Sequence, residues 1–266
     1  MLKKLLLATA ILPSVIPFVA CADATLTYQG SGPDGKMTTT LYITGDHLRM
    51  DVAGAQRPVK ILYDRATDET IMLDQQKKQY MKMSQVMKQA EAASDMMQQA
   101  LKNVPPEQRA MMSKMMGSFG KKLGNMMKQP QAEPAPVKAT FAKTGKTDAA
   151  SGVSCEWVKR VPANSVQSEF CVADYNKLGL SKADYATVKA FMAKSKKMAA
   201  SAERMSGGMI KADQMMDGDV NGLPVKTRDN AGRKMALLSK KPGANPPGGF
   251  GIPAGYSAMT MPAIPR

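Results

Sequence analysis

Residues 41–83 read LYITGDHLRMDVAGAQRPVKILYDRATDETIMLDQQKKQYMKM. Apolar and polar residues alternate around Leu41–Ile43 and Leu48–Met50, which is the two-residue period of a strand with one buried face. The segments TGD, DRATDE and DQQKK separate the apolar runs and suit tight turns. The stretch therefore predicts an antiparallel meander with one apolar face, which other elements must cover. Further strands are expected at 59–63, 70–73 and 79–83.

Two helices are predicted to follow the meander and to supply part of that cover. The first has apolar residues at helical spacing from Ser84 to Leu101 and must end before the prolines at 105–106, whose rings cannot sit in a helix interior. A second helix restarts at these prolines, and its apolar pattern continues to Met127. The two form a helical hairpin inserted between strands.

The second predicted helix is rich in methionine. Met111, Met112, Met115 and Met116 occupy one helix face at i, i+1, i+4 and i+5, and unbranched thioethers suit an irregular groove or a partner helix. The expected groove or packing face consists of Met97, Leu101, Met111, Met112, Met115, Met116, Phe119 and Leu123.

A metal site is the alternative interpretation of the same four methionines, because thioethers select Cu(I). Thioethers are weak ligands without Cys or His, however, and copper-binding strands more typically read M-x-M. That pattern occurs here as Met81-Lys82-Met83 and Met259-Thr260-Met261. The main expectation is packing, with no metal.

The N-terminus indicates export. Lys3 and Lys4 precede an apolar run that is too short and too interrupted by proline to span a bilayer, so residues 1–22 are predicted to be a signal peptide. Ala20-Cys21-Ala22 fits simple cleavage, whereas FVAC resembles a bacterial lipobox with lipid on Cys21. The expected location is the periplasm of a Gram-negative bacterium, or its outer membrane if Cys21 is lipidated.

The remaining cysteines, Cys155 and Cys171, are predicted to form a disulfide in that oxidising compartment. The segment CEWVKRVPANSVQSEFC has a turn-like centre, and folding it as a hairpin sets Cys155 opposite Cys171 and Trp157 opposite Glu169. Structural zinc would need four Cys or His ligands, and the only histidine is His47.

The C-terminal part is expected to resume strands at 138–143, followed by the cysteine hairpin and a long helix. Ser181 to Asp184 form a capping box for that helix. One of its sides carries Lys194, Lys196 and Lys197, either as a solvated face or as a surface for an anionic membrane.

A final hairpin is predicted at 223–227 and 234–238, turned at 229–232. The tail after it contains too much Pro and Gly for regular structure. Its larger side chains, Phe250, Ile252 and Tyr256, are expected to dock on the sheet.

Composition limits the function classes. The formal charge of +15 falls to +13 when the signal peptide and its two lysines are removed. An aromatic share of 5% is low for a protein that stacks bases, so no nucleic acid is expected. The positive charge suits an anionic membrane surface or acidic polymers of the envelope.

Catalysis has little support in the sequence. It contains no G-x-S-x-G elbow and no H-E-x-x-H motif, and the disulfide leaves no free thiol. His47, in the predicted strand HLRMDV, is interpreted as a surface or rim residue. The chain is therefore predicted to be non-enzymatic and to need no cofactor.

The order of these parts resembles a family of bacterial envelope proteins with a LolA/LolB-like, lipoprotein carrier-like domain. The resemblance rests on the meander, on PPEQRAMMSKMM, on GVSCEWVKRV with SEFCVADYNKLGL, and on GIPAGY. It implies an α+β fold in which an incomplete antiparallel β-barrel curves around helices and encloses an apolar concavity. The Met-rich hairpin would be an insertion into that plan. The expected boundaries are signal peptide 1–22, N-terminal strands 23–83, Met-rich hairpin 84–129, Pro-rich linker 130–137 and the rest of the domain 138–266.

Three functions follow. The first is an exported carrier that binds a hydrophobic or acyl ligand, or a lipidated partner, in the apolar groove. The second is a structural or stress-related protein that contacts the anionic envelope surface. The third is a Met-rich periplasmic Cu(I)-binding protein. The sequence does not indicate an oligomeric state.

Overall fold

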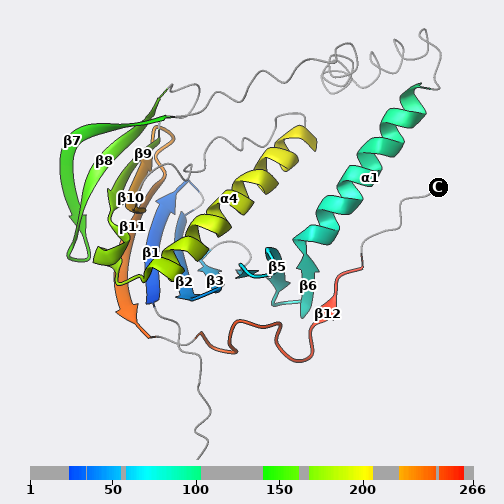
Figure 1. Ribbon diagram of the computed structural model, residues 1–266, viewed down its shortest axis with the longest axis horizontal. Coiled ribbons are helices and arrows are strands. Elements are labelled where there is room, and N and C mark those ends of the chain that lie inside the picture. Colours follow the sequence, from blue (N-terminus) through cyan, green and yellow to red (C-terminus); the bar gives the residue numbers. More distant parts are fainter. Residues whose placement is uncertain are drawn as a thin grey trace, which may run out of the picture.

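The computed structural model describes residues 24–33, 35–54, 58–102, 140–161, 168–205, 222–243 and 246–260. This part of the chain is mostly β: one open sheet of twelve strands, accompanied by two α-helices (Figure 1). Across the sheet the order is β12-β6-β5-β4-β3-β2-β1-β11-β10-β9-β8-β7. Neighbouring strands are antiparallel except for β12 and β6, which are parallel. The strands are β1 (Ala24–Gly32), β2 (Gly35–Thr44), β3 (His47–Ala53), β4 (Val59–Asp64), β5 (Glu69–Asp74), β6 (Gln79–Lys82), β7 (Thr140–Ala150), β8 (Val153–Val161), β9 (Ser168–Ala173), β10 (Leu223–Asp229), β11 (Lys234–Pro242) and β12 (Ser257–Ala258).

The predicted meander is confirmed, because β1 to β6 pair consecutively. Aspartates at the strand ends shape the turns. Asp64 accepts a hydrogen bond from the Thr67 N–H (3.1 Å), and Asp74 accepts from the N–H groups of the two residues at 76–77 (3.0 Å each). Each turn closes on a residue in the left-handed region, Asp68 or Lys78, both with φ of 49°.

One apolar row crosses the first six strands. Residues directly paired in a sheet share a face, and the register pairs Leu26, Leu41, Met50, Ile61, Met72 and Met81 in succession. We call the face that carries this row the inner face. Helix α4 (Lys182–Met205) crosses this face and contacts β2 and β3 (Figure 1).

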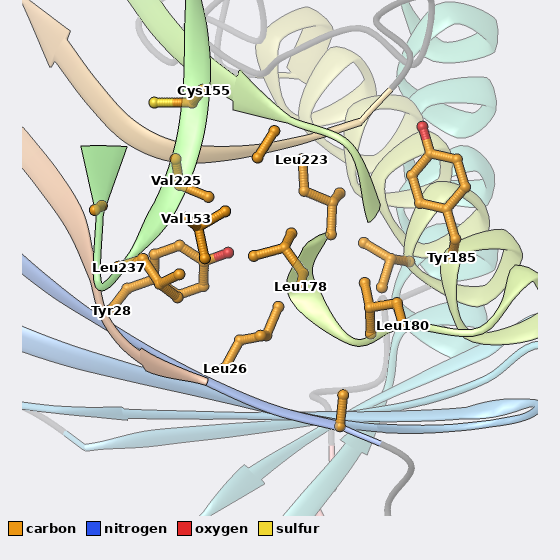
Figure 2. Close-up of a cluster of buried hydrophobic side chains, with 14 of the residues drawn as sticks. Leu26, Tyr28, Val153, Cys155, Leu178, Leu180, Tyr185, Leu223, Val225 and Leu237 are labelled. Atoms are coloured by element: carbon orange, nitrogen blue, oxygen red, sulfur yellow. The ribbon is translucent and has the colours of Figure 1, made fainter. Parts of the chain in front are cut away.

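The main buried cluster lies where α4 meets the curled end of the sheet. Figure 2 shows side chains from β1, β8, β10, β11 and the start of α4 converging there. A short 3-10 helix, η1 (Tyr175–Leu178), adds Leu178, which is 2% exposed. The capping box predicted for α4 is confirmed: the Ser181 N–H donates to the Asp184 carboxylate (3.0 Å), and the Asp184 N–H donates to Ser181 Oγ (3.1 Å).

Helix α1 (Met83–Lys102) is the first arm of the predicted Met-rich hairpin, and its boundaries agree with the predicted span of 84–101. The N–H and hydroxyl of Ser84 donate to the Glu69 carboxylate, at 3.3 and 2.5 Å. A carboxylate at this helix end also complements the helix dipole. Beyond its contacts with β5 and β6, α1 extends away from the sheet (Figure 1). The predicted second arm lies outside the described residues.

The predicted disulfide is confirmed, but the register predicted for its hairpin is wrong. Cys155 and Cys171 are joined, with 5.3 Å between their Cα atoms. In the ladder, however, Cys171 lies opposite Trp157, and Glu169 lies opposite Lys159. The pairing differs from the prediction by two residues, which leaves every side chain on its predicted face. The bridge therefore joins diagonal neighbours, whose Cα separation still falls in the bridging range of about 4.4–6.8 Å.

The tail forms more structure than predicted. It contains β12, which pairs with β6, and Arg49 donates from its Nη1 to the carbonyls of Pro247 (2.7 Å) and Gly249 (2.8 Å). Arg49 alternates with the inner-face residues of β3, so the tail runs along the opposite face. Of the predicted docking residues, Phe250 lies 5.9 Å from the ring of His47, whereas Ile252 is 36% exposed.

Two further observations bear on location. Within the described ranges no helix has the length and apolar character to cross a membrane. The disulfide is consistent with an oxidising compartment outside the cytoplasm.

Candidate ligand-binding cavity

A cavity of about 440 Å³ lies where strands β1, β2, β9, β10 and β11 end. Small-ligand pockets span roughly 300–1,000 Å³, so this volume suits one molecule of modest size. The cavity is bounded by the turn between β1 and β2 and by the turn between β10 and β11. Its position is fixed by the register of these strands, which brings residues far apart in the sequence to one end of the sheet.

The floor is a single cross-strand row. Phe170, Thr227, Met235, Gly30 and Met37 are paired in succession across β9, β10, β11, β1 and β2, and all of them line the cavity. This row lies two residues beyond Tyr28 of the main buried cluster, and hence on the inner face.

Gly30 keeps the floor open. A Cβ atom at this position would lie 2.8 Å from Cγ of Met37. That contact is with the flexible side chain of Met37, which is 41% exposed. A larger residue at Gly30 would therefore enter the cavity by displacing Met37 and need not disrupt the sheet.

A polar rim lies one step further along the same face. Arg233 Nε donates to the Asp229 carboxylate (2.6 Å), and both residues line the cavity together with Ser168. Burial works against ionisation of Asp229, but hydrogen bonds from Arg233 and Ala231 outweigh it and lower the pKa of this carboxyl. The acid on the rim is therefore ionised at neutral pH and committed to internal hydrogen bonds.

Three more basic residues line the cavity at the strand ends, in the row between the floor and the rim, whose side chains point to the opposite face of the sheet. Arg228 stacks over Trp157, 4.5 Å from the ring centroid, and is paired with Glu169. Lys36 and Lys234 also line the cavity, and neither has an acidic partner within the described part of the chain. The lining thus carries four basic residues and one acid that is already paired.

The apolar floor continues beneath α4. Phe170 belongs to a second buried cluster with Val158 and Val172, against which Phe141 and Met192 pack. The rings of Phe141 and Phe170 meet edge to face, with centroids 5.8 Å apart. Apolar side chains therefore extend from the floor of the cavity toward α4.

The groove residues predicted from the sequence are not tested by this arrangement. Met97 and Leu101 lie in α1, but their side chains fall outside the described structure. The other six, at 111–123, and the predicted lipidation site Cys21 lie outside the described residues. The cavity was not predicted, because GSGPDG, at 30–35, has the composition of a turn. The alternation of Gly30 and Gly32 along a strand was the available signal, since glycine in a strand marks close approach or open space.

His47 lies on the surface, which is one of the two positions that the sequence suggested. Its side chain is 47% exposed, and its Nδ1 lies 3.8 Å from the carboxylate of Asp64 on the next strand. The acids nearest in sequence have other partners, because Asp46 pairs with Arg65 and Asp51 pairs with Arg49. His47 is not among the residues that line the cavity.

The lysine-rich side of α4 is partly committed to internal contacts. Lys194 Nζ donates to the carboxylate (2.7 Å) and to the backbone carbonyl (3.0 Å) of Asp68, and its side chain is 24% exposed. This lysine therefore ties α4 to the turn between β4 and β5.

No protein-family model and no curated protein matches this chain. Two crystal structures of PNGF-II, in space groups C2 and P21, show a distant structural likeness. Their TM-scores are 0.39 and 0.37, with 10% and 9% sequence identity. The matches cover 88% and 89% of this chain but only 30% and 31% of the PNGF-II chains. The chain thus spans less than a third of those proteins, and a likeness at this level does not establish a shared fold or activity.

Proposed function

We propose that this chain is a non-enzymatic exported protein that binds one anionic acyl ligand, such as a fatty acid or the acyl end of an envelope lipid. The cavity at the ends of β1, β2, β9, β10 and β11 is its binding site. The observation that carries the proposal is the change along one face from a mostly apolar cross-strand row, which consists of Phe170, Thr227, Met235, Gly30 and Met37, to a rim that contains Arg233.

The two parts of the cavity match the two parts of an amphiphile. The row from Phe170 to Met37 offers apolar surface to a hydrocarbon chain, and methionine adapts to chains of different shape. Arg233, Lys36 and Lys234 lie where the headgroup would emerge, and a cation near the mouth favours a carboxylate or phosphate.

The open curved sheet with a helix across one face also supports the resemblance to lipoprotein carriers. On this proposal the protein works in the periplasm of a Gram-negative bacterium, or on its outer membrane if Cys21 carries lipid. The cavity at the strand ends, in place of the Met-rich hairpin, then supplies the acyl site.

The first test is direct. Mature protein, stripped of lipid, is titrated with cis-parinaric acid, a fluorescent long-chain fatty acid, and with its methyl ester. We expect saturable binding of one molecule of the acid and weaker binding of the ester, because the ester cannot pair with the basic rim. No saturable binding of either probe would rule out the proposal.

Variants then locate the site. Gly30→Leu should fill the cavity and reduce binding of the acid about ten-fold or more. Gly251→Leu is the matched control, since a Cβ there meets nothing within 4 Å and the residue lies in the tail. The double variant Lys36→Gln/Lys234→Gln should weaken binding of the acid more than binding of the ester. Lys146→Gln, on β7, should change the affinity for neither probe. An equal loss of affinity for the acid in Gly30→Leu and Gly251→Leu would show that the ligand binds elsewhere.

A further inference from the structure

A second cavity, of about 150 Å³, lies at one edge of the sheet, where β5, β6 and β12 meet. Three of its lining residues are methionines: Met72 on β5, Met81 on β6 and Met259 just after β12. The first methionines of the two M-x-M segments that stand out in the sequence, Met81 and Met259, are thereby brought together.

The backbone fixes the three thioethers on one face. Met72 and Met81 are direct partners in the antiparallel ladder, so their Cβ atoms lie about 4.5–5.5 Å apart. In the parallel pairing Ala258 aligns with Tyr80, so the following residues, Met259 and Met81, are also side by side. The Met259 N–H donates to the Tyr80 carbonyl (2.8 Å) and holds this alignment. With about 4.8 Å between strands, unbranched side chains can bring three sulfurs to one point.

Core packing does not account for these side chains. The two buried clusters of the described structure are built from other residues, and the methionines that pack against them are Met50, Met192 and Met235. Met72, Met81 and Met259 are half-buried at the rim of a solvent-accessible cavity. They are thus accessible to a small solute.

The local charge favours a cation. The cavity is lined by Pro58, Val59, Met72, Leu73, Asp74, Gln76, Met81 and Met259, which include one acid and no base in a chain of net charge +15. Asp74 accepts hydrogen bonds from the backbone of the adjoining turn, so it contributes negative potential and the sulfurs contribute the donor atoms.

We propose that Met72, Met81 and Met259 form a binding site for a soft monovalent cation, Cu(I) or Ag(I). Thioethers select such ions, because a neutral sulfur donor cannot match the preference of Mg²⁺, Ca²⁺ or Zn²⁺ for oxygen, nitrogen or thiolate. This site is built from other residues than the four methionines at 111–116, and it shares no lining residue with the acyl-binding cavity.

Binding of the cation would also hold the tail, residues 246–260, against the sheet. Met259 reaches the sheet at the end of a segment that begins beneath Arg49, and β12 itself has only two residues. A cation shared by Met259 and Met81 would add a cross-link between the tail and β6, and so would slow local opening of residues 256–260.

The experiment uses Ag(I) as a redox-inert probe. Its binding to the mature protein is measured by isothermal titration calorimetry in chloride-free buffer. Met81→Leu and Met259→Leu should each reduce the affinity by at least about ten-fold. Leucine preserves apolar volume, so folding should survive. Met50→Leu, on the same inner-face row but outside the cavity, is the matched control and should bind like the wild type.

A second measurement tests the geometry. Hydrogen exchange in residues 256–260 should slow on addition of Ag(I) in the wild type and should not respond in Met81→Leu. The proposal is overturned if the wild type does not bind Ag(I), or if Met81→Leu and Met259→Leu bind as tightly as Met50→Leu. It is also overturned if binding disappears only when Met111, Met112, Met115 and Met116 are all replaced by leucine.

Discussion

Asp184, in the first turn of α4, accepts a hydrogen bond from the backbone N–H of Gly45 at 2.9 Å, although 139 residues separate them. The hydroxyl of Thr187, one turn later, donates to the carbonyl of the same glycine. Both backbone polar groups of Gly45, in the turn between β2 and β3, are thus satisfied by α4. Asp184 and Thr187 are fully buried, so this contact fixes where the helix crosses the inner face.

Asp184→Ala should therefore lower the free energy of unfolding by about 2–3 kcal/mol, through loss of the cap and of an acceptor for a buried N–H. Asp184→Asn is the matched variant. Its amide oxygen can still accept from Gly45, so we expect a smaller loss. Urea unfolding followed by circular dichroism measures both, and equal losses would contradict the role of the Gly45 bond.

Arg49→Met should destabilise the protein and release the tail. The Arg49 side chain is 2% exposed, is bound by both Asp51 oxygens (2.7 and 2.8 Å), and donates to two tail carbonyls. Removing one partner of a buried ion pair costs about 3–5 kcal/mol.

The control for Arg49 is Arg65→Met, which breaks the exposed pair with Asp46 and should cost no more than about 1 kcal/mol. Hydrogen exchange gives the second readout. Exchange in residues 246–260 should become faster in Arg49→Met and remain unchanged in Arg65→Met. An unchanged tail in both variants would show that Arg49 does not hold it.

Gly222→Ala should destabilise the fold by about 3 kcal/mol through strain and a steric clash. Gly222 has φ of 133°, and a Cβ there would lie 2.3 Å from the carbonyl oxygen of Ala173. Its N–H also donates to the hydroxyl of Tyr185 (2.8 Å), which joins β10 to α4. Gly248→Ala is the control, because its φ is also positive, at 82°, but a Cβ meets nothing within 4 Å. Thermal unfolding should therefore separate the two variants clearly.

The ion pair between Lys194 and Asp68 should make the free energy of unfolding depend on pH in the acidic range. A hydrogen bond from Lys194 is the largest of the influences that hold the pKa of Asp68 below its usual 3.8. Because the folded-state pKa is depressed, the associated stability is present above the unfolded pKa and is lost as the pH falls through the folded pKa. Burial and the neighbouring Asp68 charge also raise the pKa of Tyr63 to about 12.

Lys194→Met should remove that acid-dependent part of stability. The urea midpoint of the wild type should fall more steeply than that of the variant between about pH 5 and pH 2. Lys189→Met, on the same helix, is the control, since Lys189 lies over the ring of Tyr185 and pairs with no acid in the described structure. Parallel pH profiles for wild type and Lys194→Met would contradict the assignment.

Local patterns predicted the elements well. The alternation in LYITGDHLRMDV and the aspartate-led turns after it predicted β2 to β6, and Ser181 with Asp184 predicted the start of α4. In each case the decisive interactions lie within a few residues, such as the Asp74 carboxylate and the next two N–H groups. The disulfide followed from cysteine count and compartment. The hairpin register did not, because registers that differ by two residues bury the same side chains.

The candidate sites were harder to predict, for a different reason. The acyl cavity depends on β1 pairing with β11, which brings Gly30 beside Met235 across about two hundred residues of chain. The proposed cation site depends on a two-residue strand that no alternation pattern could reveal. The local signals, which are the alternating Gly30 and Gly32 and the two M-x-M segments, do not show which strands meet.

The sequence alone therefore determined the strands of the meander, the capped helix and the disulfide, because each depends on short-range stereochemistry or on composition. Only the tertiary structure decided which edges pair, where the tail runs and which side chains meet. These outcomes depend on burial of Arg49, Asp184 and Gly222 against segments distant in the chain, and the free energy of such contacts exists only once the whole sheet has formed.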